Sequence, residues 1–255
     1  MARERFERVA VHRPDLRLPF PERFAARLTR QTVLAVHRRA KYLLITLSSG
    51  ETLVMHLGMS GSFRVGRVRP GPTAGRHDHV VFYMSSGAVV TFNDPRRFGF
   101  MDLVAAGALA SHPVLSRLGP EPLSAGFDAF TLALACKGKK TSLKAALLDQ
   151  RVVSGLGNIY ASEALHVARL SPDRRASTIA TSSGLPRDPA RRLAAAIKQV
   201  LTEAIARRSG KIYRSSRFRV YDREAQPCLR AGCRGIIRRR TQAGRSTFFC
   251  PRCQK

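Results

Sequence analysis

The chain carries Cys228-Leu229-Arg230-Ala231-Gly232-Cys233 and then, sixteen residues later, Cys250-Pro251-Arg252-Cys253. Each close pair of cysteines lets one turn of backbone present two thiolates to the same metal ion. The segment between the pairs can fold as a hairpin that brings all four sulfurs together. The spacing therefore predicts a four-sulfur, tetrahedral zinc site, which holds shape and does not catalyse because protein fills every ligand position.

The residues around these cysteines complete the predicted module. Segments 235–240 and 246–249 are the expected strands, and Ala243-Gly244 is the expected turn. Two disulfides or unrelated free thiols are the alternative, which a reducing compartment disfavours. The fifth cysteine, Cys136, lies among apolar residues and is expected to pack in a core. The module also carries arginines, which suit phosphate contacts: Arg234, Arg238, Arg239, Arg240, Arg245 and Arg252.

The charge of the whole chain points to an anionic partner. Its 255 residues include 45 Lys and Arg against 17 Asp and Glu, a formal net charge of +28. Nucleic acid is the leading candidate for neutralising such a field. No run approaches the roughly 18 apolar residues of a membrane-spanning helix, and residues 1–8 lack the apolar centre of a signal peptide. We therefore expect a cytoplasmic protein without a membrane partner, associated with the nucleoid when bound to DNA.

The order of the predicted elements changes near residue 106. Before it, short strands separated by turn residues favour a sandwich or barrel, with one helix at 21–28. The strands are expected at 32–36, 42–47, 52–56, 79–83 and 89–92. After it, Ala- and Leu-rich segments predict a separate helical domain. The helices are expected at 105–111, 130–136, 142–148, 158–168 and 189–207.

Several stretches together resemble the formamidopyrimidine-DNA glycosylase and endonuclease VIII family, in family order and over residues 6 to 255. The stretches are Arg38-Arg39-Ala40-Lys41-Tyr42-Leu43-Leu44, Met55-His56-Leu57-Gly58-Met59-Ser60-Gly61, His77-Asp78-His79, Asn93-Asp94-Pro95-Arg96-Arg97-Phe98-Gly99, Leu118-Gly119-Pro120-Glu121-Pro122-Leu123, Gly155-Leu156-Gly157-Asn158-Ile159-Tyr160-Ala161-Ser162-Glu163, and Gly244-Arg245-Ser246-Thr247-Phe248-Phe249-Cys250.

The resemblance implies a multi-domain α+β protein. Its expected parts are an N-terminal β-sandwich at residues 1–105, a helix-two-turn-helix domain at 106–208, a short basic linker in the lesion-loop region at 209–225, and a C-terminal β-hairpin zinc finger at 226–255. The implied partner is double-stranded DNA containing damaged bases, clamped between the lobes of a monomer. One structural Zn²⁺ is the implied cofactor.

The activity that the resemblance implies is bifunctional. A damaged purine is flipped out of the duplex, because its glycosidic bond is shielded in the stack. An N-glycosylase step is followed by strand cleavage at the abasic site through a Schiff base. By resemblance, Lys41 assists β-elimination, whereas Arg245 serves δ-elimination and grips the lesion phosphate.

The resemblance also assigns residues that hold the DNA. Met59, Arg96 and Phe98 match the three residues that enter the duplex when the lesion leaves it, where an apolar wedge and an aromatic ring replace lost stacking. Ordinary core packing is the alternative for Met59 and Phe98. The remaining assigned residues are expected to contact DNA, mainly through phosphates: His56, His77, Arg96, Arg97, Lys139, Lys144 and Asn158.

The sequence departs from the family pattern in two places. The family begins with a proline nucleophile and a glutamate acid/base on its first helix, whereas this chain begins Met1-Ala2-Arg3. Either the start codon lies upstream or the chain is a truncated relative; the retained Lys41 and Arg245 favour an upstream start. The stretch 209–219 is also short and basic where many members carry a loop over 8-oxoguanine, so preference for that lesion does not follow.

Three functional hypotheses remain after these observations. The first is a bifunctional glycosylase and abasic-site lyase acting on oxidised purines, formamidopyrimidines and 8-oxoguanine. The second is the same clamp without chemistry, a catalytically impaired protein that binds damaged DNA. The third is a zinc-ribbon protein that binds RNA or the ribosome, which explains the charge and the cysteines but not the ordered resemblance along the chain.

Overall fold

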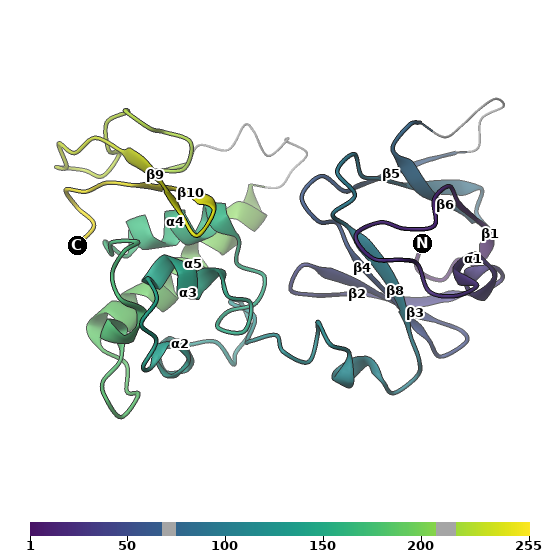
Figure 1. Cartoon of the computed structure of the whole chain (residues 1–255), viewed down its shortest axis with the longest axis horizontal. Helices are drawn as coiled ribbons and strands as arrows, with labels where there is room; N and C mark the ends of the chain where they lie inside the picture. The colour runs from purple at the N-terminus through teal and green to yellow at the C-terminus, as the bar shows by residue number, and fades with distance from the viewer. Residues whose placement is uncertain (68–74, 208–217) are drawn as a thin grey trace. The chain divides into compact units, whose positions relative to one another are not determined.

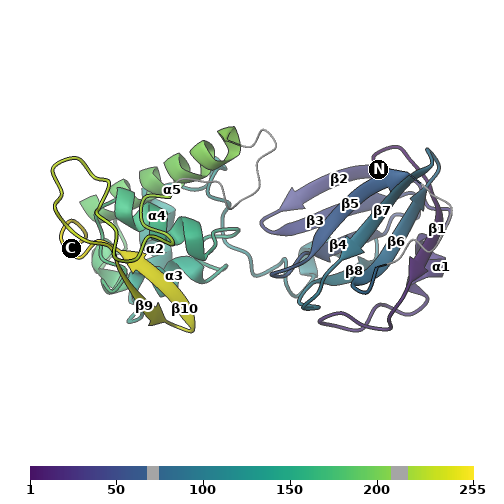
Figure 2. The same ribbon diagram turned by 90° about the horizontal axis from the view of Figure 1, so that it is seen from above.

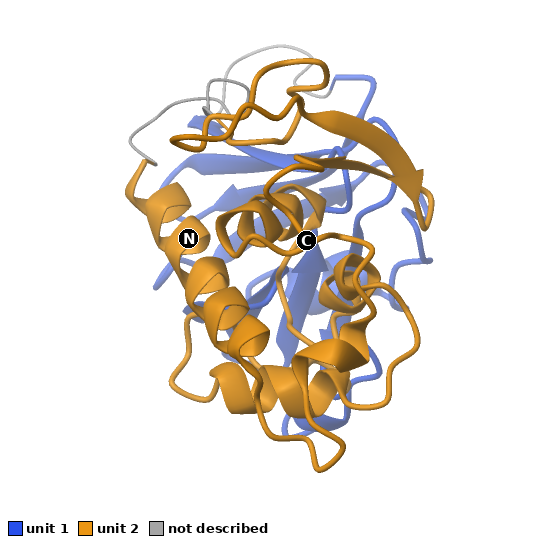
Figure 3. Cartoon of the chain, turned by 90° about the vertical axis from the view of Figure 1, so that its left-hand side faces the viewer, with its two compact units in different colours: residues 1–116 blue, residues 117–255 orange. Residues whose placement is uncertain are grey.

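The computed structural model describes residues 1–67, 75–207 and 218–255 (Figure 1). The contacts divide the chain into two compact units, residues 1–116 and 117–255 (Figure 3). The predicted limits at 105 and 208 stay predictions, and most of the basic stretch 209–219 lies outside the described residues.

The first unit is a β-sandwich of two four-stranded antiparallel sheets, seen as two layers in Figure 2. One sheet has the order β1 (Phe6–Val11), β6 (Asp78–Met84), β7 (Ala88–Asn93), β5 (Ser62–Arg67). The other has the order β2 (Val33–Arg39), β3 (Tyr42–Leu47), β4 (Thr52–His56), β8 (Phe100–Val104). The short helix α1 (Phe24–Leu28) buries Phe24 and Leu28 in the same core. The predicted sandwich is confirmed.

Strand β4 shows why both faces of the second sheet are apolar. Leu53 and Met55 pack into the core between the sheets, whereas Val54 points to the other face. That outer face is covered by Leu109 and Leu115, which follow β8. The buried strand is therefore apolar at consecutive positions, as expected for a strand covered on both sides.

The predicted helix at 105–111 is wrong. Only a single 3₁₀ turn, η1 (Leu109–Ser111), forms in this segment. Gly107 has φ +76°, a left-handed conformation that ends regular helix geometry, and Pro113 follows the turn. The segment instead consists of turns, and its Leu109 and Leu115 are partly buried against the outer face of the sheet.

The second unit is helical and carries a β-hairpin. Its helices are α2 (Ala129–Cys136), α3 (Leu143–Leu148), α4 (Asn158–Val167) and α5 (Asp188–Ala206), with the 3₁₀ helix η2 (Ala176–Ile179). Helix α2 begins at a capping box, in which Asp128 accepts from the backbone N–H of Thr131 and the threonine hydroxyl accepts from that of Asp128. The α5 helix has a proline in its first turn. Cys136 is fully buried in this core, as predicted.

The hairpin pairs β9 (Arg238–Gln242) with β10 (Arg245–Phe249) in antiparallel register. Ala243 and Gly244 both have positive φ, 49° and 70°, as a two-residue hairpin turn requires. Strand β10 contacts α4. Among the described residues, none of the helices has the length and apolar character needed to cross a membrane.

Candidate functional site

The four predicted zinc ligands converge. The sulfurs of Cys228, Cys233, Cys250 and Cys253 all lie within 4.8 Å of one another. The Cys228–Cys253 separation is 3.9 Å and the Cys233–Cys250 separation is 3.7 Å. A tetrahedron with Zn–S bonds of about 2.3 Å has sulfur–sulfur edges of roughly 3.8 Å, whereas a disulfide needs about 2.0 Å. The donor set fits zinc and excludes the disulfide alternative.

The backbone around the cluster is shaped for these sulfurs. A Cβ on Gly235 would lie 2.5 Å from the sulfur of Cys250, so only glycine fits there. The backbone N–H of Gly235 also lowers the pKa of the Cys233 thiol. Burial raises the pKa of Cys253 to about 12 and raises that of Cys228. A divalent cation at the centre is what would stabilise four thiolates here.

The residues predicted to enter the duplex lie on two loops of the sandwich. Met59, between β4 and β5, is 73% exposed, and Phe98, between β7 and β8, is 40% exposed. Neither side chain is core, so the packing alternative is not supported. The Arg96 guanidinium carbon lies 4.6 Å from the centre of the Phe98 ring, a cation–π contact.

Asp94 ties these two loops together, and sequence reasoning missed its role. The fully buried carboxylate accepts from the Ser60 hydroxyl at 2.5 Å and from the backbone N–H of Gly99 at 2.8 Å. The same hydroxyl accepts from the backbone N–H of Arg96 at 3.1 Å. A buried charge with several donors fixes its surroundings, because each lost donor leaves the carboxylate undersolvated.

The loops also touch backbone to backbone at Gly58. This residue has φ +66°, and a Cβ there would lie 2.4 Å from the carbonyl carbon of Phe98. A glycine next to Met59 therefore permits the close approach of the two loops. The signal was present in the sequence as glycines flanking the predicted inserting residues.

His56 lies at the end of β4 beside Lys41. Its Nδ1 accepts from the backbone N–H of Gly58 at 3.0 Å, so Nε2 carries the proton in the neutral ring. Burial first, and then the charges of Lys41 and Arg17, lower the pKa of His56. The ring is therefore a neutral donor, suited to a phosphate oxygen. Lys41 itself is exposed, in the turn between β2 and β3.

His77 and Arg97 lie near the same loops. The carbonyl of His77 accepts from the backbone N–H of Asp94 at 3.0 Å. Arg97 has φ +57°, is exposed, and lies 3.7 Å from Asp15 as a loose ion pair. Loops of the sandwich thus carry Lys41, Met59, His77, Arg96, Arg97 and Phe98, and His56 ends strand β4.

Lys144, in the helical unit, is buried, whereas a residue that binds phosphate is expected to face solvent. The side chain is 1% exposed, and Nζ donates to the Ser246 carbonyl at 3.0 Å and to the Thr247 hydroxyl at 2.7 Å. Burial, Arg245 and Arg240 lower the pKa of Lys144 to about 8. Lys144 therefore supports the hairpin, and its contact with phosphate stays a prediction.

Asn158 and Arg245 lie close to this support. Asn158 is the first residue of α4, and its Nδ2 donates to the Ser246 carbonyl at 2.9 Å. Arg245 begins β10 and is exposed. Lys139, half-buried, lies in the turn after α2. Since Ser246 follows Arg245 directly, Lys144 and Asn158 fix the backbone from which that arginine extends.

Glu163 is a second buried carboxylate that the sequence did not reveal. It lies on α4, is 3% exposed, and accepts from the backbone N–H groups of Arg219, Val220 and Tyr221 at 2.7 to 3.0 Å. These bonds anchor the chain that leads into the cysteine module.

A β-sandwich, a helical unit and a four-cysteine hairpin, each displaying basic side chains, define a zinc-finger protein of the DNA-binding class. Comparisons with known proteins narrow this class. Residues 1–101 match the formamidopyrimidine-DNA glycosylase N-terminal domain, residues 118–216 match the H2TH domain of the same glycosylase, and residues 225–255 match the zinc finger found in FPG and IleRS. The chain belongs to the formamidopyrimidine-DNA glycosylase family.

Individual relatives agree over nearly the whole length. The formamidopyrimidine-DNA glycosylase of Rhodopseudomonas palustris strain BisA53 is 56% identical, over 98% of this chain and 93% of the relative. The MutM (Fpg) structure from Thermus thermophilus is 37% identical with a TM-score of 0.82, covering 100% of this chain and 92% of that one. The Lactococcus lactis enzyme bound to DNA containing FAPY-dG is 26% identical with a TM-score of 0.86, covering 99% and 93%.

Proposed function

We propose that the protein acts in base-excision repair, as a DNA glycosylase and abasic-site lyase that removes oxidised purines. The observation that carries the proposal is the pair of loops joined by Asp94, which hold Met59, Arg96 and Phe98 toward solvent. Its relatives are formamidopyrimidine-DNA glycosylases, one of them solved on DNA containing FAPY-dG, and they support the same class of substrate.

The loops supply what base flipping requires. Removing one purine from a duplex forfeits stacking on both sides, and an aromatic side chain that stacks on a neighbouring base restores about 1–3 kcal/mol. An apolar side chain can fill the gap as a wedge. Met59 and Phe98 are exposed apolar groups on a fixed backbone, so inserting them removes apolar surface from water. Arg96, held against Phe98, can donate to the orphaned base.

The basic residues supply phosphate contacts and the later chemistry. His56, His77, Arg97, Lys139, Lys144 and Asn158 are proposed to hold the backbone of the strand. In the proposed reaction an amine forms a bond to the sugar C1′, and the base leaves with the electrons of the glycosidic bond and takes up a proton. The C1′–O4′ bond of the sugar then breaks, and this ring opening gives the Schiff base. Loss of a proton from C2′ then expels the 3′ phosphate, a step that Lys41 is proposed to assist. Arg245 is proposed to grip the lesion phosphate and to serve δ-elimination.

One structural Zn²⁺ is part of the proposal. Cys228, Cys233, Cys250 and Cys253 would hold it with no position left for substrate, so the ion would fix the hairpin and hence the position of Arg245. As proposed, the protein acts as a monomer on nucleoid DNA in the cytoplasm.

Borohydride trapping tests the chemistry directly, since it reduces a Schiff base to a stable bond. The 255-residue chain is mixed with a duplex carrying 8-oxoguanine and with a duplex carrying an abasic site. A covalent adduct on the 8-oxoguanine duplex supports excision, and an adduct on the abasic duplex alone supports only the lyase. Damage-specific binding without any adduct favours the second candidate, a damage-binding protein without chemistry. An in-frame Met-Pro-Glu start in the DNA upstream of Met1 would supply the nucleophile that the family uses.

A further inference from the structure

A buried histidine lies against the cysteine cluster. His166, in the last turn of α4, is 2% exposed, and its Nε2 lies 3.3 Å from the sulfur of Cys228. A metal-bound thiolate offers only lone pairs, so the ring nitrogen facing it must be the protonated one. The imidazole is thus placed as a hydrogen-bond donor to one of the four sulfurs.

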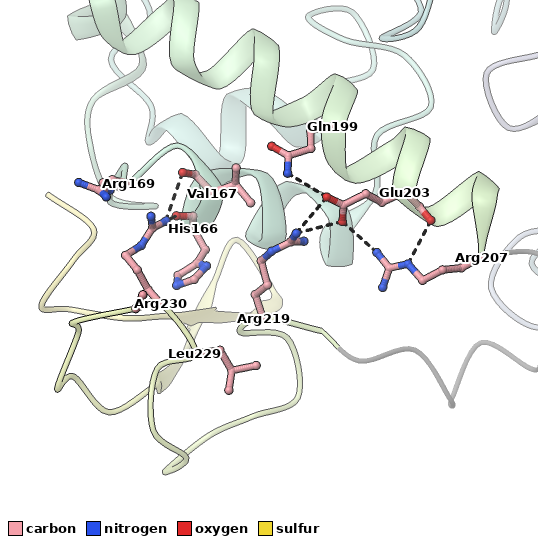
Figure 4. Close-up of a pocket in the computed structure, with 10 residues that line it drawn as sticks. His166, Val167, Arg169, Gln199, Glu203, Arg207, Arg219, Leu229 and Arg230 are labelled. Carbon is pink, nitrogen blue, oxygen red and sulfur yellow. Dashed lines mark hydrogen bonds and ion pairs between the residues drawn. The ribbon is translucent and has the colours of Figure 1, made fainter.

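Arg230 joins the loop that carries Cys228 to the end of helix α4. Its Nη2 donates to the carbonyls of His166 at 2.5 Å and Val167 at 3.2 Å, at the C-terminal end of α4 (Figure 4). Because Arg230 follows Cys228 by two residues, the loop that carries the ligand is tied to the helix that carries the histidine. A cation at a helix C-terminus is also favourable electrostatically.

The second ring nitrogen is consistent with this assignment. Within the described residues, His166 Nδ1 and Arg230 Nε are both buried and without a hydrogen-bond partner. Figure 4 shows the ring beside the Arg230 side chain. Because Nδ1 has no hydrogen-bond partner and Nε2 faces the Cys228 sulfur, the tautomer with the proton on Nε2 is the one that makes a hydrogen bond.

We propose that His166 is a positioning residue of the zinc site, which donates from Nε2 to the Cys228 thiolate and joins the zinc module to α4. The inference rests on the proposed zinc site. A four-thiolate zinc centre carries a net negative charge, and hydrogen bonds to its sulfurs lower the tendency of a thiolate to take a proton and leave the metal. Outer partners of this kind change metal affinity by about 10- to 100-fold.

Both ends of helix α4 therefore contact the zinc module. Asn158, at the start of α4, donates to the Ser246 carbonyl in the hairpin, and His166, near its end, contacts Cys228. The ten residues of α4 thereby set the distance between the metal and the hairpin turn. Loss of zinc would release one of these attachments and leave Arg245 less firmly placed.

Two substitutions separate the hydrogen bond from the volume of the ring. His166→Phe fills the space without an N–H, whereas His166→Gln keeps a donor nitrogen near the position of Nε2. His112→Phe is the control, because His112 is another poorly exposed histidine, bonded to Asp102 at 3.0 Å and remote in sequence from the cysteines. Zinc release from the full-length protein to an excess of a chromogenic chelator is followed by absorbance.

We expect His166→Phe to release zinc at least about tenfold faster than the wild type, and His166→Gln and His112→Phe to release it at nearly the wild-type rate. Cobalt-substituted protein should show thiolate-to-metal charge-transfer bands that shift in His166→Phe. Nitrogen-15 NMR of the wild type at neutral pH should show the Nε2-protonated tautomer.

Equal release from both His166 variants and the wild type, or an Nδ1-protonated ring, would overturn the inference while leaving the zinc site intact. Wild-type protein without zinc, and without charge-transfer bands after cobalt is added, would overturn the zinc site itself. The NMR measurement needs no variant, so a variant that fails to fold does not remove the test.

Discussion

The hydroxyl of Ser60 donates to the buried carboxylate of Asp94 at 2.5 Å, across 34 residues of sequence, and joins two loops of the sandwich. One loop carries Met59 and the other carries Arg96 and Phe98. Under the proposed function these three residues enter one small gap in a duplex, which requires a fixed spacing between them. The buried bond provides it without using any atom of the three side chains.

Replacing Asp94 with Asn should loosen this arrangement. The amide turns one acceptor into a donor that faces either the Ser60 hydroxyl or the Gly99 N–H, so one bond is lost and a polar group is left unpaired. We expect a loss of about 1–3 kcal/mol in the free energy of unfolding and weaker binding to a duplex with an abasic-site analogue. Asp188→Asn, at an exposed carboxylate on α5, is the control in urea unfolding and fluorescence anisotropy. Wild-type behaviour of Asp94→Asn in both assays would contradict the role.

Replacing Met59 with Ala separates binding from stability. The side chain is 73% exposed, so its removal should change the free energy of unfolding by less than about 0.5 kcal/mol. The affinity for the abasic-analogue duplex should fall by roughly tenfold, whereas the affinity for undamaged duplex stays constant. A parallel fall in both affinities would mean that Met59 does not enter the duplex.

Replacing Gly235 with Ala tests the shape of the metal centre. The added methyl group would lie 2.5 Å from the Cys250 sulfur, so the ligand set has to shift and zinc should be lost from the purified protein. Gly66→Ala, where nothing lies within 4 Å of the new Cβ, should keep one zinc per chain by elemental analysis. Full zinc content in Gly235→Ala would refute the geometry of the centre.

Lys144 gives a prediction about pH. Its pKa is about 8 in the folded protein against 10.5 ordinarily, so between these values the unfolded chain binds more protons. The unfolding free energy contributed by this group therefore rises with pH across that window, by about 1–3 kcal/mol. Urea unfolding from pH 8 to 10.5 should show this rise in the wild type relative to Lys144→Met. Parallel stability curves for the two proteins would be inconsistent with the burial of an ammonium group at Lys144.

The cysteine module could be predicted because the spacing of its cysteines along the chain is enough to indicate a four-sulfur metal site. Most strands of the sandwich were predictable for a similar reason, since apolar runs bounded by turn residues leave few alternatives. Strands β1, β5 and β8 were missed. In β5 nearly all residues are exposed, with Arg64, Gly66 and Arg67 among its six, and the strand is held by pairing with β7. Its structure comes from the partner strand and not from its own composition.

The supporting residues of the site could not be predicted in the same way. From the sequence, Lys144 was predicted to be a phosphate ligand like the other basic residues. Only the fold shows that its hydrogen-bond acceptors, on Ser246 and Thr247, lie about a hundred residues away in the chain. Asp94 and His166 are likewise ordinary residues of a loop and a helix until their partners, Ser60 and Cys228, are brought to them. Exposed functional residues can be recognised from a sequence pattern, whereas the buried residues that hold them in place can be recognised only from tertiary contacts.

The measurement that bears most directly on the central claim is the affinity of the 255-residue chain for two duplexes of identical sequence, one undamaged and one with a stable abasic-site analogue, at a fixed salt concentration. The account predicts binding at least about tenfold tighter to the damaged duplex, because only that duplex has a gap for Met59 and Phe98 to fill. Equal affinity for both would show that the +28 charge merely attracts nucleic acid, and would contradict a role in recognising damaged DNA.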